Sequence, residues 1–104
     1  MAEQQGELDA VKVDPQHYTV EVDNERVRAL RIRYGPRETS VMHSHPDGVL
    51  VCLTAFHARF TFPDGTTQEL QGQPGQVLWA PAGPHLPENL TDTPLELILI
   101  ELKS

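Results

Sequence analysis

The chain has five histidines, and two of them form the triplet His43-Ser44-His45. Residues i and i+2 of a β-strand point to the same side of the strand, about 7 Å apart along the backbone. Two imidazoles placed in this way can converge on one point about 2 Å from a nitrogen of each ring, which is the length of a metal–nitrogen bond. The triplet therefore predicts a pair of metal ligands on a strand, although such pairs also occur by chance on protein surfaces.

A third histidine, His85, follows a segment whose backbone is tightly restricted. Two prolines and a glycine occur in Pro81-Ala82-Gly83-Pro84, immediately before it. Such a segment can aim one side chain accurately, so His85 is a candidate third ligand. For the remaining two histidines we expect no part in metal binding. His57 alternates against the phenylalanines of its strand and should be exposed, and His17 stands at the start of a strand.

The elements that must hold these histidines are predicted to be short strands. Alternating or continuous apolar residues predict strands at 17–22, 26–34, 39–45, 49–53, 56–62, 68–70, 76–80 and 95–102. The alternation in 26–34 slips once at Ala29 and Leu30, which predicts a β-bulge that keeps all four arginines of this segment on the solvent side. No segment combines a helical apolar stripe with caps. The pattern predicts an all-β sandwich or barrel with little or no helix.

Length and charge limit the possible roles. The 104 residues suffice for one domain, which we place at residues 10–104 after a flexible tail at residues 1–9. The net charge of −7 disfavours a nucleic-acid partner. No apolar run reaches the roughly 20 residues that span a bilayer, so we expect no membrane partner. The polar N-terminal residues and the single cysteine, Cys52, lead us to expect a cytoplasmic protein.

The two histidine segments resemble the paired motifs of the cupin superfamily. The first motif, built around His-x-His, is similar to residues 36–46. The second motif is similar to the segment that contains Gly75, Pro81-Ala82-Gly83, His85 and Asn89. The resemblance extends over residues 18–102. It implies a small single-domain bacterial cupin: an antiparallel jelly-roll β-barrel, also called a double-stranded β-helix.

The resemblance also implies a metal site, with one important departure. The glutamate ligand of the first motif would fall at Val49 or Leu50, neither of which can bind a metal. Arg37 also replaces a usual glycine, and one residue instead of two separates Gly83 from His85. The matched ligands are therefore His43, His45 and His85, with Asp47 and Glu88 as the nearby carboxylates that could add a fourth. We expect one divalent transition metal, and imidazole donors do not distinguish iron, nickel, zinc, copper and manganese.

Three-histidine cupins include oxygenases, so the resemblance implies a small-molecule dioxygenase or a related metal-dependent enzyme, whose catalytic residues the sequence does not identify. The alternative is a non-catalytic module that binds a metal or a small ligand. A homodimer is also expected, because the strand at 95–102 offers an apolar face. Alternation predicts that the pocket for a small-molecule ligand is lined by Val41, Val49, Val51, Phe60, Phe62 and Trp79.

Overall fold

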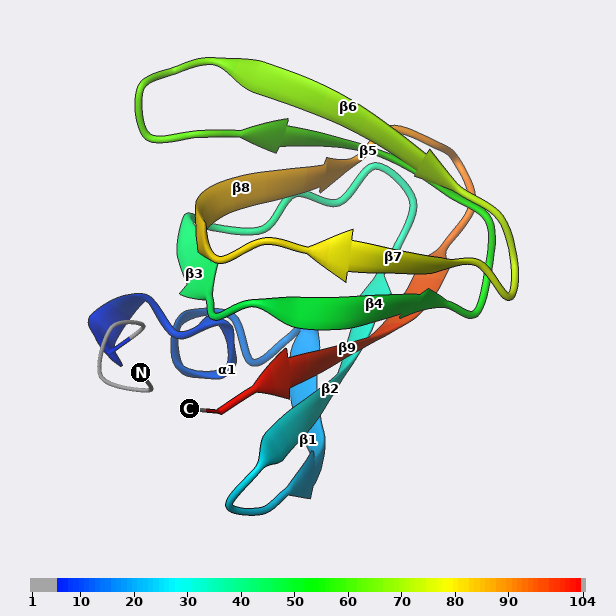
Figure 1. The fold of residues 1–104 in the computed structure, drawn as a ribbon. Coiled ribbons are helices and arrows are strands. Elements are labelled where there is room, and N and C mark those ends of the chain that lie inside the picture. The colour runs from blue at the N-terminus through cyan, green and yellow to red at the C-terminus, as the bar shows by residue number, and fades with distance from the viewer. Residues whose placement is uncertain (1–5, 104) are drawn as a thin grey trace.

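The computed structural model describes residues 6–103 and consists of two antiparallel sheets that face each other (Figure 1). One sheet has five strands, in the order β1 (Tyr18–Asp23), β2 (Val27–Tyr34), β9 (Leu95–Leu102), β4 (Gly48–Cys52) and β7 (Val77–Ala80). The other has four, in the order β3 (His43–His45), β8 (Gly83–Asn89), β5 (Phe56–Thr61) and β6 (Thr67–Gly72). Between residues 6 and 103, helix is limited to η2 (Gly6–Leu8) and α1 (Ala10–Val13). The predicted all-β jelly roll with little helix is confirmed.

The core lies between the two sheets and is filled by alternate residues of their strands. Strand β9 contributes Leu95, Leu97 and Leu99, each no more than 7% exposed. Strand β2 adds Leu30 and Ile32 beside them. Buried Phe56 and Ala58 of β5 close the core from the opposite sheet. Removal of this apolar surface from water is the main favourable term in folding, and it makes the barrel a rigid support for the histidines.

Strand β8 is not among the strands predicted from the sequence, which leave residues 81–94 without a strand. Pro84 and Pro87 both lie inside this strand. Each proline removes one backbone donor from the ladder, so the segment does not have a strand-like composition. Nevertheless, β8 pairs with β3 on one side and with β5 on the other. His85 is therefore held by a sheet rather than by an isolated turn.

The predicted bulge at Ala29 and Leu30 is wrong. Strand β2 pairs with β9 without interruption, and the register shift lies in β1, between Val20 and Val22. Because β2 alternates regularly, Arg28 falls on the inward side with Leu30 and only Arg31 and Arg33 of its arginines point outward. The expectation that all four arginines face solvent therefore fails at Arg28, whose side chain is 18% exposed and lies opposite Glu101.

The chain before β1 packs against the end of the barrel. The flexible tail expected at residues 1–9 falls largely on residues 1–5, which lie outside the described residues. From Gly6 onward the chain is folded: Asp9 forms a bridge with Ser44 of β3, and Ala10 of α1 is fully buried. Neither helix found between residues 6 and 103 is long or apolar enough to cross a bilayer.

Candidate metal centre

Three histidines from two neighbouring strands meet at one end of the barrel. His43 and His45 lie two residues apart on β3, and His85 of β8 is the direct cross-strand partner of His43. The ring centroids are 4.8 Å apart for His43 and His45, 5.0 Å for His43 and His85, and 5.5 Å for His45 and His85. One nitrogen from each ring lies within 4.8 Å of the other two. Small side-chain rotations would bring all three to the roughly 2.0–2.1 Å of a metal–nitrogen bond.

The tautomer of His43 is fixed by its neighbours. Its Nδ1 lies 2.9 Å from the carbonyl oxygen of Val41, which can only accept a hydrogen bond, so Nδ1 carries the proton. The hydroxyl of Ser40 is 3.2 Å from the same nitrogen and donates its own proton to Asp14. Nε2 of His43 consequently presents a lone pair, and this buried atom has no hydrogen-bond partner among the described residues. Such an orphaned lone pair is costly unless an electrophile occupies the space in front of it.

The tautomer of His45 is fixed in the same sense by a carboxylate. Its Nδ1 lies 2.8 Å from Oε2 of Glu101, and both side chains are almost fully buried. The carboxylate accepts a hydrogen bond from Nδ1–H, so Nε2 is the ring nitrogen that presents a lone pair. Metal-binding histidines in proteins commonly donate their second ring nitrogen to a carboxylate or a carbonyl in this way. His43 and His45 thus show the two usual arrangements side by side.

His85 is oriented by packing. Its ring stacks on Phe60, with 5.0 Å between centroids and 26° between planes. Burial, reinforced by His45 and His43, lowers the pKa of His85 to about 3. Burial and the neighbouring His45 lower the pKa of His43 to about 4. Both rings are therefore neutral at pH 7, which is the form that binds a metal. The donor set of three imidazoles, with an orphaned buried nitrogen among them, fits a divalent transition ion.

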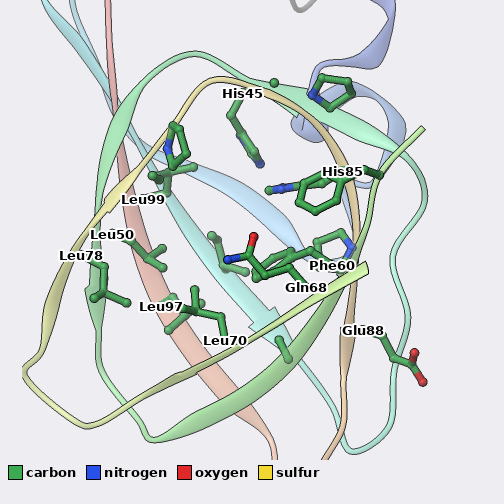
Figure 2. Close-up of a pocket in the computed structure, with 18 of the residues that line it drawn as sticks. His45, Leu50, Phe60, Gln68, Leu70, Leu78, His85, Glu88, Leu97 and Leu99 are labelled. Carbon is green, nitrogen blue, oxygen red and sulfur yellow. The ribbon is translucent and has the colours of Figure 1, made fainter. Parts of the chain in front are cut away.

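A cavity of about 660 Å³ opens in front of His45 and His85. Figure 2 shows His45 and His85 at one end of it, with leucine side chains along the facing wall. No lysine or arginine is among the described residues that line it. Its polar groups include the hydroxyls of Tyr18 and Tyr34, which are 2.7 Å apart and stay protonated because burial raises the pKa of both phenols. The apolar lining is formed mainly by Ile32, Leu50, Phe56, Phe60, Leu70, Leu78, Leu97 and Leu99.

Half of the predicted pocket lining is wrong. Phe60 and Phe62 do line the cavity, whereas Trp79 only borders it, because it pairs with the outward Val49 and is 58% exposed. Val41 is 47% exposed and lies outside it. Val49 and Val51 point to the outer face of the five-stranded sheet, because β4 begins at Gly48 and places Leu50 inward. The Pro46-Asp47-Gly48 loop shifts the alternation by one residue relative to His43 and His45.

Neither carboxylate considered as a fourth ligand joins the histidine cluster. Asp47 is exposed, and its Oδ1 accepts a hydrogen bond from the backbone nitrogen of Ala82 at 2.7 Å. Glu88 borders the cavity but points away from the histidines in Figure 2, and it lies 3.6 Å from Arg59. The cluster of groups that could bind a metal thus contains three imidazoles and no carboxylate.

The sequence reasoning missed two residues behind the histidines, Glu101 and Arg28. Both carry a signal in the alternation of their strands. Glu101 shares the inward parity of Leu95, Leu97 and Leu99 along β9, whereas Glu96 has the outward parity. Arg28 shares the inward parity of Leu30 along β2. A charged residue at an inward position needs a partner, and the register of β2 and β9 places these two opposite each other.

Comparison with solved structures identifies the family. A cupin domain from Bordetella pertussis Tohama I is 31% identical to this chain; the match covers 84% of this chain and 92% of the other, with a TM-score of 0.77. The chain belongs to the cupin superfamily. An RmlC-like cupin with a double-stranded β-helix fold from Methanocaldococcus jannaschii is 19% identical, over 86% of this chain and 83% of the other, with a TM-score of 0.63.

A further match is the polyketide cyclase RemF from Streptomyces resistomycificus, at 17% identity over 82% of this cupin and 63% of RemF, with a TM-score of 0.59. At this level of identity the likeness concerns the fold alone and assigns no reaction. No protein-family model matches the sequence, and no curated protein matches it. The residues of the site therefore have to carry the functional argument.

The lowered pKa values of His43 and His85 predict a pH dependence for the metal-free cupin. Below the ordinary histidine pKa of 6.5 the unfolded chain takes up protons at both positions, while the folded chain resists protonation until about pH 4 at His43 and about pH 3 at His85. The free energy of unfolding should fall as the pH drops from about 6.5 to about 4, by about 1.4 kcal/mol for each imidazole per pH unit.

Urea denaturation of chelator-treated protein between pH 7 and pH 4.5 measures this slope. A variant with both His43→Gln and His85→Gln should show a shallower slope, because it lacks both protonation sites. Equal slopes for the variant and the parent would contradict the assignment of the two rings as neutral in the folded state.

Proposed function

We propose that this cupin binds one divalent transition metal through His43, His45 and His85 and uses it to bind a small, largely apolar molecule in the adjoining cavity. The observation that carries the proposal is the buried Nε2 of His43, which has no hydrogen-bond partner among the described residues, in a ring whose centroid lies 4.8 Å from that of His45 and 5.0 Å from that of His85. A divalent ion held there would supply Lewis acidity and open coordination positions for an oxygen- or sulfur-bearing group. The chain's own residues orient the imidazole rings, exclude water from the site and determine the shape of the ligand cavity.

The charges around the cavity restrict the ligand. Three neutral imidazoles leave a divalent ion with its full charge, so the ligand end that binds it should be anionic and preferably bidentate. The remainder of the ligand meets leucine, isoleucine and phenylalanine side chains, and no lysine or arginine of the described lining can pair with a second negative charge. Asp64 borders the cavity and would repel such a charge. We therefore propose an apolar molecule with a single chelating end.

Dioxygenase chemistry is the more specific form of this proposal, and a binding module is the alternative. Oxygen uptake by the iron-loaded protein with a panel of diketones, thiols and small acids separates the two. Uptake that needs both the metal and one class of substrate supports a dioxygenase. Binding of the same compounds without uptake supports a module that senses or stores its ligand. A cytoplasmic location is also a proposal, with which the buried free thiol of Cys52 is consistent.

Loss of a single ligand should abolish metal retention without unfolding the barrel. We expect His43→Ala or His85→Ala to lose the metal by elemental analysis and to keep the circular dichroism spectrum of a β protein. The matched control is His57→Ala on the outer side of β5, where the histidine pairs with Glu69 at 2.8 Å. Metal content in either ligand variant equal to that of the parent and the control would refute the ligand assignment.

Selectivity for an apolar chelator is a separate prediction. With the zinc-loaded protein, benzoylacetone should bind at least about tenfold more tightly than malonate, a difference of about 1.4 kcal/mol. Both compounds can present two oxygens in a 1,3 arrangement, but benzoylacetone adds a phenyl ring and malonate a second charge. Isothermal titration calorimetry measures both affinities. Equal or stronger binding of malonate would contradict the proposed ligand class.

We also propose that the cupin forms a homodimer through the outer face of the five-stranded sheet. That face carries Val77 and Trp79, which are 61% and 58% exposed, beside Val51 and Ile98. The outer face of the four-stranded sheet is polar instead, with Arg59 close to Glu69 and Glu88. An exposed apolar sheet face of this kind favours burial against a second copy.

The dimer should dissociate when a charge is placed at the centre of this contact. Sedimentation velocity of Val77→Glu at micromolar concentration should show a monomer, because the buried charge has no partner. His57→Glu, on the polar outer face, should stay dimeric like the parent. A monomeric parent protein, or a dimer that Val77→Glu leaves intact, would rule out this interface.

A further inference from the structure

We infer that Glu101 is a positioning residue that holds His45 ready for the metal and supplies, one hydrogen bond away from the site, the negative charge of the glutamate ligand that the first cupin motif lacks here. This inference rests on the proposed metal centre. It concerns a residue on β9, 56 positions after His45 in the chain, that carries no motif of its own.

Both oxygens of Glu101 are engaged, in opposite directions. Oε2 lies 2.8 Å from Nδ1 of His45, and Oε1 accepts a hydrogen bond from Nε of Arg28 at 2.8 Å. Glu101 is 3% exposed, so water does not compete for these contacts. A carboxylate that served only to neutralise Arg28 would have no need of the second contact. The contact with His45 fixes both the rotation of the ring and the nitrogen that carries its proton.

The charges behind His45 add up to −1. Arg28 also binds Asp9 through its two terminal nitrogens, at 2.5 and 3.1 Å. The positive guanidinium thus lies between two carboxylates, and only Glu101 of these touches a histidine of the site. Arg28 holds Glu101 in place, while Asp9 offsets the charge of Arg28. The excess negative charge is therefore directed towards His45.

His43, whose ring is also held by hydrogen bonds, has no direct contact with a carboxylate among the described residues. Nδ1 of His43 faces the carbonyl of Val41 and the hydroxyl of Ser40, and Asp14 reaches it only through that hydroxyl. The position that would hold a glutamate ligand is occupied on the inward side by Leu50, which lines the cavity. The carboxylate thus lies behind one ligand, at Glu101, and not among the three candidate ligands. With no carboxylate among its ligands, an ion held there would keep room for an anionic ligand, and the charge of Glu101 would lie one hydrogen bond behind His45.

Two substitutions test the inference against a matched control on the same strand. Glu101→Gln removes the charge with little change of shape, and Glu101→Ala also removes the hydrogen bond. The control is Glu96→Gln, because Glu96 lies on the outer side of β9 and pairs with Arg31 at 2.5 Å and Arg33 at 3.3 Å. Competition with a chromogenic chelator measures the affinity of each protein for zinc. The absorption spectrum of the cobalt(II)-substituted protein reports on the geometry of the ligands.

We expect zinc affinity to fall about tenfold in Glu101→Gln and by 10- to 100-fold in Glu101→Ala, with an altered cobalt spectrum in the alanine variant. Glu96→Gln should match the parent in both measurements. If the parent binds zinc and both Glu101 variants bind it equally well, Glu101 has no role at the site and the inference fails alone. If His85→Ala retains zinc as well as the parent does, the proposed metal centre itself fails. Should the alanine variant not fold, the comparison of Glu101→Gln with Glu96→Gln decides the question.

Discussion

The central constraint on this structure is a buried imidazole lone pair that has no hydrogen-bond partner among the described residues. Nε2 of His43 is in this position because the opposite ring nitrogen, Nδ1, carries the proton and donates it in a hydrogen bond to the carbonyl of Val41. A buried acceptor without a donor costs free energy, and natural structures keep few of them without a reason. Two further imidazoles approach the same point, so a cation that binds all three lone pairs would remove that cost. The short β3–β8 ladder is the element that brings the rings together.

Behind the histidines lies a layer of buried polar contacts that reaches to the N-terminal segment. Asp9 binds Arg28, and Arg28 in turn binds Glu101, which contacts His45. In the second chain of contacts, Asp14 accepts a hydrogen bond from Ser40, which lies beside His43. Each of these groups is paired, as buried charges and hydroxyls must be. The cavity side of the rings is the opposite, since leucine and phenylalanine side chains predominate there. The site therefore combines a polar support on one side with an apolar ligand chamber on the other.

The sequence predicts the fold and points to three histidines that the structure brings close together, because both depend on local patterns. Alternation identifies most strands, and His-x-His with the Pro-x-Gly segment before His85 marks the site. The prediction fails where the alternation of apolar residues is interrupted or where the pairing of strands overrides it. The loop before Gly48 reverses the phase of β4, which turns Val49 and Val51 outward, and two prolines hide β8. In the sequence, an arginine at an inward position looks like a break in the alternation, which is why the sequence predicts a bulge there. Only the pairing of β2 with β9 shows that Arg28 lies opposite Glu101.

The most direct test of the account is the anomalous scattering of crystals grown from the metal-loaded protein. Data collected on both sides of the absorption edge of the bound element locate the ion independently of any assumption about its ligands. We expect one strong anomalous peak about 2.0–2.2 Å from a nitrogen of each of His43, His45 and His85, with Glu101 still hydrogen-bonded to His45. A peak at some other group of residues, or a metal-loaded crystal with no peak between the three rings, would contradict it.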